Sequence, residues 1–328
     1  MRTRITALLM CSLLFGFGSG AQAAENWDMA VAYPAGNYQA KSAEQFAAEV
    51  AKATNGQVNI KVQAGGALGF KGPEMLSAIG DGLVPIGTML LNQQVGVEPL
   101  LGIASLPYLV STPAEMRLIT EIARPMYEKI AAKHNQKILY IVPWPGQNIF
   151  TKSEIREPGD FHDLKIRTVD RNGSNFFREL GASPAQMPWG EVVPSLATGV
   201  INSVTTSSSS GVDGQFWDFM KYCYLVNWQS NFDMVTVNLD RWGKLTPAQQ
   251  RSIEDVAKKL EPEFWKAAQE EDATKLKILS DKGIKLVQPD AKIRDFMIGK
   301  AKPTWEAFMT KVPSARAIIE KYRAAAKK

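Results

Sequence analysis

The stretch LKIRTVDRNGSNFFRELGASPAQMPWGEVVPSLATGVINSVTT, residues 164–206, decides the fold. It predicts a strand over Leu164–Val169 and a helix over Asn172–Leu180. A second helix is expected over Gly190–Thr198 and a second strand over Val200–Thr206, with a glycine where each helix ends. Strands that alternate with helices favour an α/β fold with a parallel sheet and right-handed crossovers.

The same alternation precedes this stretch. A capping box at Thr112-Pro113-Ala114-Glu115 begins a helix that should run to about His134. After a strand at Lys137–Val142, residues 143–147 (PWPGQ) break the pattern, and we expect the chain to cross there from one lobe to another. The elements expected earlier in the chain are a strand face at Trp27–Tyr33, a helix over 39–54, strands at Val58–Val62 and Pro85–Leu90, and a short helix that opens at Pro73.

The rest of the chain should return to the first lobe and then span both. Strands are predicted at Tyr222–Val226 and Val235–Asn238, and the second of them would carry the chain back. A capping box opens a long helix over about 247–282, in which Pro262 should cause a kink. A late strand at Ile284–Val287 and two more helices follow. The sequence therefore predicts two α/β lobes that exchange strands, with a ligand-binding cleft between them.

Residues 1–23 have the order of a secretory signal peptide. Arg2 and Arg4 precede an apolar run, and Ala21-Gln22-Ala23 supplies a cleavage site of small residues. A lipoprotein signal at Cys11 is a less favoured alternative. No later stretch is long and apolar enough to cross a bilayer. We therefore expect a periplasmic protein that is exported and is not embedded in a membrane.

The mature chain should consist of two interrupted lobes and should not bind nucleic acid. Cleavage removes two arginines and no acids, so the formal charge of +5 falls to +3, and basic and acidic residues interleave. The expected organisation is a first lobe over 24–145 completed by about 236–260, a second lobe over 146–235 completed by about 261–310, and a C-terminal helix over 311–328.

Few residues suggest catalysis, a metal or a cofactor. Cys223 is the single cysteine of the mature chain and is expected to be a small buried residue. Two histidines, His134 and His162, are too few for a histidine-based metal site. Ser207–Ser210 is either a flexible surface loop or a set of small donors that face the cleft. A hydrolase built on these serines would need a nearby base, and neither histidine lies near them in sequence.

Arg167 is the strongest candidate for contact with a ligand. It lies at the carboxyl end of a predicted strand, where open α/β sheets bind their ligands. A guanidinium at that place can hold a carboxylate through two parallel N–H···O bonds. The alternative role is a surface salt bridge.

The sequence resembles the DctP-type solute-binding proteins of tripartite ATP-independent periplasmic (TRAP) transporters. LKIRT at 164–168 and LGASPAQMPWGEVVPSLATGVIN at 180–202 are similar to the central motif of that family. Gly66-Ala67-Leu68-Gly69 matches its G-x-L-G turn, and Leu106-Pro107-Tyr108 matches its leucine–proline–aromatic step. The resemblance covers nearly all of residues 24–310. It implies a two-lobed Venus-flytrap protein that closes on an organic acid and delivers it to TRAP membrane permease subunits.

The resemblance also implies roles for single residues. The family's carboxylate-binding arginine falls on Arg167, and its aromatic that packs on the bound acid falls on Trp189. The ligand-facing asparagine of many members lies nearest to Thr206, a second arginine of some members is Gln147, and a histidine common in the family is Trp228. These departures exchange charged groups for aromatic and neutral ones.

The first lobe departs from the family pattern as well. Where sugar-acid-binding members offer acids to ligand hydroxyls, the nearest positions are Phe70, Lys71 and Leu90. Unpaired buried polar groups are costly, so a pocket with one arginine and several aromatics should prefer a flat or apolar monocarboxylate, such as an aromatic or α-keto acid. The other residues expected to bind the ligand are Tyr33, Asn37, Trp144, Ser207 and Ser208.

Other functions stay open at this point. The same fold could bind a sugar acid or a C4-dicarboxylate. An exported hydrolase and a ligand sensor that presents its closed lobes to a membrane receptor are the remaining alternatives.

Overall fold

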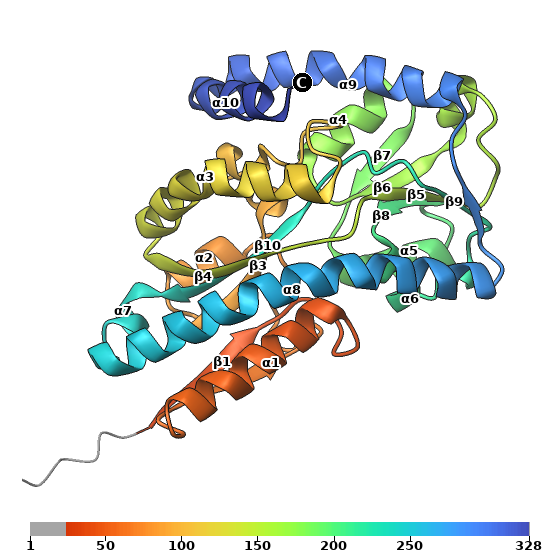
Figure 1. Cartoon of the computed structure of the whole chain (residues 1–328). Coiled ribbons are helices and arrows are strands. Elements are labelled where there is room, and N and C mark those ends of the chain that lie inside the picture. Colours follow the sequence, from red (N-terminus) through yellow and green to blue (C-terminus); the bar gives the residue numbers. More distant parts are fainter. Residues whose placement is uncertain (1–23, 328) are drawn as a thin grey trace, which may run out of the picture.

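Two β-sheets form the centres of two lobes (Figure 1). The computed structural model describes residues 24–327, so the predicted signal peptide lies outside the described residues. In the order in which they pair, the strands of the first sheet are β2 (Val58–Gln63), β1 (Glu25–Ala30), β3 (Ile86–Leu90), β10 (Phe232–Asn238) and β4 (Gln136–Pro143). Those of the second sheet are β11 (Lys285–Val287), β9 (Tyr222–Tyr224), β5 (Asn148–Thr151), β8 (Ser203–Thr206), β6 (Lys165–Thr168) and β7 (Ser183–Gln186).

The α/β fold with exchanged strands is confirmed, but the sheets are mixed rather than parallel. β1 pairs in parallel with β2 and β3, and β6 pairs in parallel with β7 and β8. In contrast, β10 is antiparallel to β3 and β4, and β5 is antiparallel to β8 and β9. β5 and β10 each enter their sheet directly after the chain crosses between the lobes. They have no helical crossover, which a parallel connection would require.

Helices cover both faces of each sheet. They are α1 (Tyr38–Ala53), α2 (Met75–Gly80), α3 (Pro113–Lys133), α4 (Arg171–Glu179), α5 (Val192–Ala197), α6 (Ser208–Asp213), α7 (Leu239–Trp242), α8 (Pro247–Asp281), α9 (Ala291–Lys311) and α10 (Arg316–Ala326). In the first lobe, α1 and α8 pack in one apolar cluster, and α2, α3 and α10 pack in another. In the second lobe, α4 and α9 share one cluster, and α5 shares the other with the end of α8.

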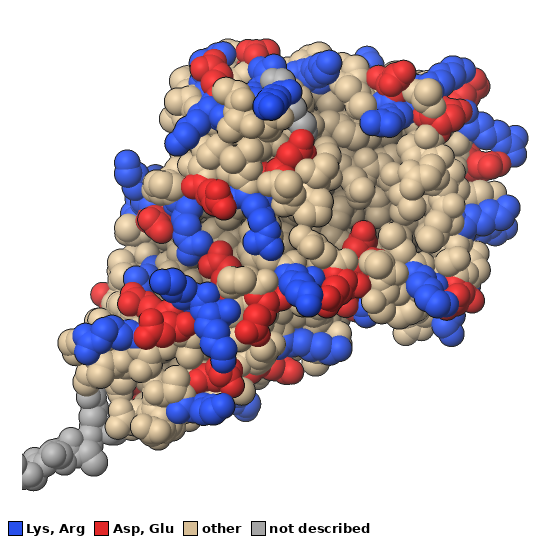
Figure 2. All heavy atoms as spheres, in the orientation of Figure 1, with Lys and Arg blue, Asp and Glu red and all other residues tan. Residues whose placement is uncertain are grey.

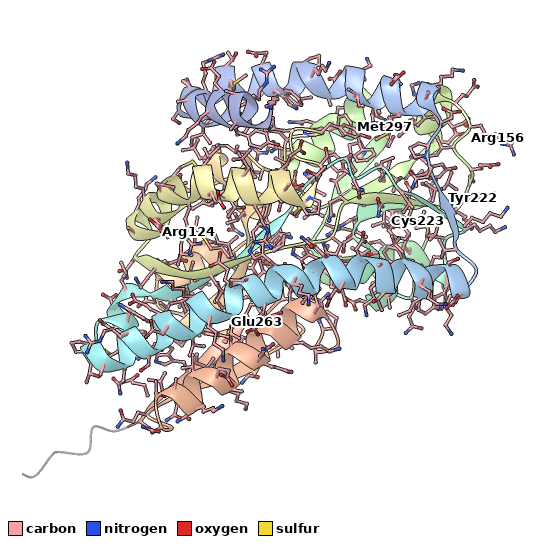
Figure 3. The ribbon with its side chains drawn as sticks, in the orientation of Figure 1. Arg124, Arg156, Tyr222, Cys223, Glu263 and Met297 are labelled. Carbon is pink, nitrogen blue, oxygen red and sulfur yellow. The ribbon has the colours of Figure 1, made fainter. Side chains whose placement is uncertain are left out.

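Two helices belong to both lobes, as the predicted long helix implies. α8 runs unbroken through Pro262, with its first-lobe contacts reaching Ala268 and a second-lobe contact at Leu279. α9 begins in the second-lobe core, where Met297 is buried (Figure 3), and ends against the first lobe at Met309. The lobe bounds expected from the sequence stay a prediction, because these two helices contribute to both cores.

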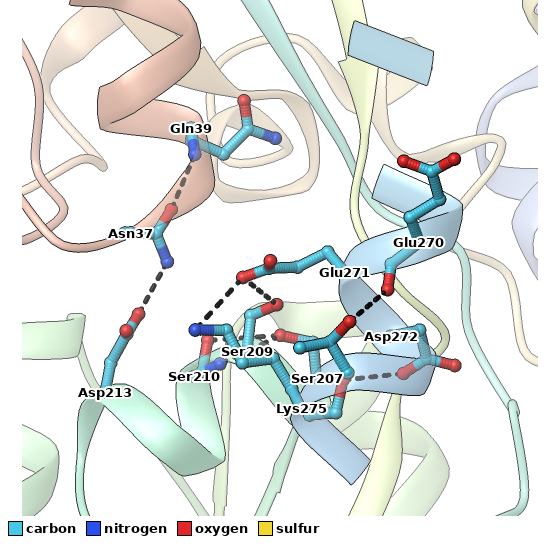
Figure 4. A network of polar contacts seen from close by, with 12 residues as sticks. Asn37, Gln39, Ser207, Ser209, Ser210, Asp213, Glu270, Glu271, Asp272 and Lys275 are labelled. Carbon is cyan, nitrogen blue, oxygen red and sulfur yellow. Dashed lines mark hydrogen bonds and ion pairs between the residues drawn. The ribbon is translucent and has the colours of Figure 1, made fainter. Parts of the chain in front are cut away.

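The sequence does not predict β5, β7 and α6, each of which has only four to six residues. The surface-loop interpretation of Ser207–Ser210 is wrong, because all four serines are buried. Ser207 caps α6, and the hydroxyls of Ser208 and Ser209 donate to Asp272 at 2.6 Å and Glu271 at 3.3 Å on α8 (Figure 4). The polar run therefore joins α6 to the long helix.

The two segments that cross between the lobes lie side by side. The backbone N–H of Trp144 donates to the carbonyl of Asn231 at 2.9 Å, and that of Trp228 donates to Gln147 at 3.2 Å. Gly146 lies directly opposite Asn227, whose Oδ1 is 1.9 Å from the place that a Cβ at position 146 would occupy. Asn227 itself has a positive φ of 42°. A Cβ at position 146 would therefore displace the Asn227 side chain.

Gly146→Ala should lower the free energy of unfolding by about 1–3 kcal/mol, the usual cost of overpacking. Adding Asn227→Gly should restore most of that loss, because the opposing side chain is removed and glycine adopts positive φ readily. Gly299→Ala is the control, since a Cβ there meets nothing within 4 Å. Urea unfolding measures all three. An equal loss with and without Asn227→Gly would contradict the proposed steric cause.

Candidate functional site

A cavity lies between the lobes, where β3, β6 and β8 end. Its free interior is small, about 30 Å³. Its lining comes from the first lobe (Tyr33, Asn37, Leu90, Gln93), the crossing segments (Trp144, Gln147, Asn231) and the second lobe (Arg167, Val169, Trp189, Thr206, Ser207, Ser210, Asp213).

The structure brings together most of the residues that the sequence nominates. Their role in ligand binding stays a prediction, but their convergence on one cavity from distant parts of the chain is what a binding site requires. The predicted residues that line the cavity are Tyr33, Asn37, Leu90, Trp144, Gln147, Arg167, Trp189, Thr206 and Ser207.

Three predicted residues lie outside the cavity lining. Phe70 packs, half-buried, against an apolar cluster of the first lobe. Ser208 points to α8 and donates to Asp272. Trp228 is fully buried in the second-lobe core, and its indole N–H donates to the hydroxyl of Thr205 at 2.6 Å. Sequence position alone places these side chains near the site, whereas helix and core packing turn them away from it.

Arg167 on β6 is a buried cation. Its side chain is 2% exposed, and Nε and Nη2 both donate to the backbone carbonyl of Met187, at 3.1 and 2.9 Å. No acidic side chain within residues 24–327 forms an ion pair with it. Burial lowers the pKa of Arg167 to about 10, against the opposing effect of Asp170. The guanidinium is therefore charged at neutral pH, and its Nη1–Nη2 edge is not used by Met187.

Aromatic rings make one wall of the cavity, and a buried carboxylate holds them. Trp144 meets the ring of Tyr33 edge-on at 4.9 Å and that of Tyr38 at 5.3 Å. Asp233 on β10 accepts from Trp144 Nε1 at 2.7 Å through Oδ2 and from Tyr33 Oη at 3.1 Å through Oδ1. Asp233 is fully buried, and burial raises its pKa to about 7.

Polar acceptors make another part of the lining. Asn37 caps α1 and donates from Nδ2 to Asp213 Oδ2 across the lobe boundary at 2.6 Å (Figure 4). Burial raises the pKa of Asp213. Asn231 has a buried Oδ1 that no group of the described chain donates to. The cavity thus offers oxygen acceptors to a ligand as well as one cation.

Sequence reasoning did not identify Gln93, Val169, Asp213 and Asn231 as lining residues, and it named Ser210 only as part of a serine run that could face the cleft. A helical interpretation of the serine run would have pointed to Asp213, which lies three residues after Ser210 on α6. Val169 directly follows the Arg167 strand. Gln93 lies in a short 3-10 helix and Asn231 in an irregular segment, and neither carries a sequence signal.

The structure gives no arrangement for serine catalysis or metal binding within the described chain. The Ser207 hydroxyl is 3.3 Å from that of Ser210, and no described serine of this run contacts a histidine. Cys223 on β9 is buried (Figure 3), and burial raises its pKa. Residues 24–327 contain no group of three or more histidine, cysteine or acidic side chains placed to hold a metal ion.

The outer surface fits the charge interpretation from the sequence. Lysine and arginine interleave with aspartate and glutamate over the face in Figure 2, without a large area of one sign. Over the described residues, no helix is both long and apolar enough to span a membrane.

Comparison with known proteins agrees with this geometry. The sequence profile of the bacterial extracellular solute-binding proteins, family 7 (DctP), matches residues 29–311. The chain belongs to this family. Family 7 proteins serve transport and are not an enzyme class, and they work with TRAP membrane permeases.

Three similar proteins show the range of ligands in the family. A Bordetella pertussis extracytoplasmic solute receptor described as binding pyroglutamic acid is 28% identical and superposes with a TM-score of 0.89, over 92% of this chain and all of its own. The ectoine-binding periplasmic protein TeaA of Halomonas elongata is 26% identical, over 84% of this chain and 82% of its own. A TRAP solute-binding protein of Chromohalobacter salexigens with bound D-glucuronate is 22% identical. It superposes with a TM-score of 0.85 over 91% of this chain and 99% of its own. This family 7 protein therefore shares its fold with solute-binding proteins described with pyroglutamic acid and with D-glucuronate.

Asp233→Asn should stabilise the ligand-free binding protein at neutral pH. The folded protein raises the pKa of Asp233 from 3.8 to about 7, so it binds this proton more tightly than the unfolded chain does. The stability of the wild type should therefore fall as pH rises from about 4 to about 7, by at most about 4 kcal/mol, and the variant should lack this loss. Urea unfolding at several pH values measures it, with Asp295→Asn as the exposed control. If the difference in free energy of unfolding between variant and wild type does not grow with pH, the raised pKa of Asp233 is contradicted.

Proposed function

We propose that this family 7 protein captures a compact monocarboxylate in its interlobe cavity and delivers it to TRAP permease subunits. The observation that carries the proposal is the buried guanidinium of Arg167. It is held at one edge by the Met187 carbonyl and has no acidic partner among the described residues. A buried cation is stable only with compensating partners, and a ligand carboxylate on the Nη1–Nη2 edge would supply them.

The charges of the lining favour one carboxylate over two. Arg167 is the single basic residue of the lining, and Asp213 is its single acidic residue. A second ligand carboxylate would lie in a buried site without a cation and would be repelled by Asp213, which makes dicarboxylates poor candidates.

The acceptors of the lining favour a ligand that also carries an N–H donor. Asn231 Oδ1 is buried without a partner, and Asp213 lies beside Asn37 at the same cavity. The rings of Tyr33, Trp144 and Trp189 favour a flat body. Pyroglutamate, a five-membered lactam with one carboxylate, combines these features. Receptors described as binding it, from Bordetella pertussis and a marine metagenome, are 26–28% identical to this chain and support the proposal.

The sequence alone favoured an aromatic or α-keto acid, because the aromatics were visible in it and the polar acceptors were not. Those acids remain the second candidates, since Trp144, Tyr33 and Trp189 would pack on them equally well. A calorimetric panel of pyroglutamate, phenylpyruvate, benzoate and glucuronate separates these classes. Tight binding of glucuronate alone would refute the proposal.

Arg167→Ala should weaken binding of pyroglutamate at least tenfold, because a charge-assisted hydrogen bond contributes about 1.5–3 kcal/mol. Arg167→Lys should also weaken it, since an ammonium cannot make the forked contact. Arg171→Ala, an exposed arginine at the start of α4, is the matched control and should bind as the wild type does. Unchanged affinity in Arg167→Ala would place the carboxylate elsewhere.

Replacing the ring N–H by oxygen tests the acceptors directly. The lactone analogue of pyroglutamate, 5-oxotetrahydrofuran-2-carboxylate, keeps the carboxylate and the ring but has no N–H. It should bind the wild type at least fivefold more weakly, because a buried acceptor loses its donor. Asp213→Asn and Asn231→Leu, measured with both ligands, show which acceptor is responsible. Equal affinity for lactam and lactone would contradict the N–H contact.

A further inference from the structure

We propose that Asp233 is a positioning residue that couples capture of the carboxylate to uptake of one proton. The inference rests on the proposed function, since it requires an anionic ligand at Arg167. Asp233 does not line the cavity, but both of its hydrogen-bond donors, Tyr33 and Trp144, do. It therefore acts on the cavity through the positions of these two lining side chains.

The ionised carboxylate fixes the direction of the Tyr33 hydroxyl. Asp233 Oδ1 accepts the Tyr33 proton at 3.1 Å, and Oδ2 accepts the Trp144 N–H at 2.7 Å. An indole N–H can only donate, whereas a phenol can donate or accept. When Asp233 is ionised, the Tyr33 hydroxyl donates its hydrogen bond to Oδ1 and cannot donate it to a ligand.

Protonation at Oδ1 reverses one of these two bonds. The proton comes from solvent, and Oδ1–H then donates to Tyr33 Oη, while Oδ2 still accepts from Trp144. The Tyr33 hydroxyl turns its own proton toward the cavity that it lines. No covalent bond other than the new O–H is formed. The protonated state thus offers the ligand carboxylate one more donor, and the ring of Trp144 stays in place.

The surroundings make this proton easy to take up. Asp233 is 0% exposed, and no basic side chain of the described residues forms an ion pair with it. The titratable groups around it are Tyr33, Tyr38 of α1 and Tyr140 of β4, and all three have a raised pKa and are neutral. The charge of Arg167 on β6 opposes the rise in the pKa of Tyr33. A ligand carboxylate adds a second negative charge nearby, which favours protonation of Asp233 further.

The test is calorimetry with pyroglutamate at pH 7 in two buffers of different ionisation heat. The carboxyl group of this ligand is ionised throughout, so any proton taken up is bound by the protein. We expect the wild type to take up a fraction of one proton per ligand at pH 7, because Asp233, with a pKa of about 7, is already partly protonated before the ligand binds. We also expect its affinity to fall at least threefold from pH 6 to pH 8.5.

Two variants separate this coupling from a merely structural role. Asp233→Asn presents an NH₂ to Tyr33 and an oxygen to Trp144, as the protonated acid does, so it should bind pyroglutamate without proton uptake and with a flat pH profile. Tyr33→Phe should weaken binding more at pH 6 than at pH 8.5, because the hydroxyl contributes only when Asp233 is protonated. Asp295→Asn should keep the wild-type profile.

The outcomes are distinct. Pyroglutamate binding with no proton exchange in the wild type, or with unchanged exchange in Asp233→Asn, overturns the coupling and leaves the proposed function standing. No binding of pyroglutamate to the wild type overturns the pyroglutamate assignment and the coupling with it. A uniform loss of affinity at every pH in Asp233→Asn, with proton uptake retained, would reduce Asp233 to a structural residue.

Discussion

A buried guanidinium bound to a backbone carbonyl is the constraint on which the site depends. Arg167 is 2% exposed, and the Met187 carbonyl accepts from both Nε and Nη2. This pair of bonds fixes the plane of the guanidinium and leaves its other edge free. Burying a charge without a counter-charge is unfavourable, so the site is biased toward an anion before any ligand arrives. The shape and polarity of the walls then decide which anion fits.

Hydrogen bonds near the cavity also join the two lobes. Asn37 donates to Asp213 across it at 2.6 Å, and Asn92 donates to Asp170, which also caps α4. Lys71 and Glu191 add an ion pair at 3.7 Å, but both side chains are more than half exposed and contribute little. A ligand that contacts both lobes would add to these bonds only in the closed arrangement, which is how a binding protein converts ligand affinity into closure.

Sequence reasoning recovered the parts of the fold that long periodic segments encode. α3 and α8 begin at the predicted capping boxes, because a threonine and a glutamate or glutamine three residues apart satisfy each other's backbone. It missed short elements such as β5, β7 and α6. It predicted the second half of β10 and the return of the chain to the first lobe, but not the antiparallel direction of that strand.

The residues of the site also fall into those that the sequence could predict and those that it could not. Arg167 and Trp189 could be predicted because they lie in a motif of a recognisable family. Asp233 could not, since it neither lines the cavity nor belongs to that motif, and its role appears only when β10 brings it beside Tyr33 and Trp144. Trp228 was misplaced for the opposite reason: a motif position suggested the cavity, whereas stacking on Phe176 turns the ring into the core. Long-range packing therefore decides which polar residues can act together.

The most direct test of the account is a crystal structure of this protein with pyroglutamate bound. The account predicts both carboxylate oxygens within about 3 Å of Nη1 and Nη2 of Arg167, with the Met187 contact unchanged. A carboxylate bound elsewhere in the cavity, with the Nη1–Nη2 edge of Arg167 turned away from it, would contradict the central claim.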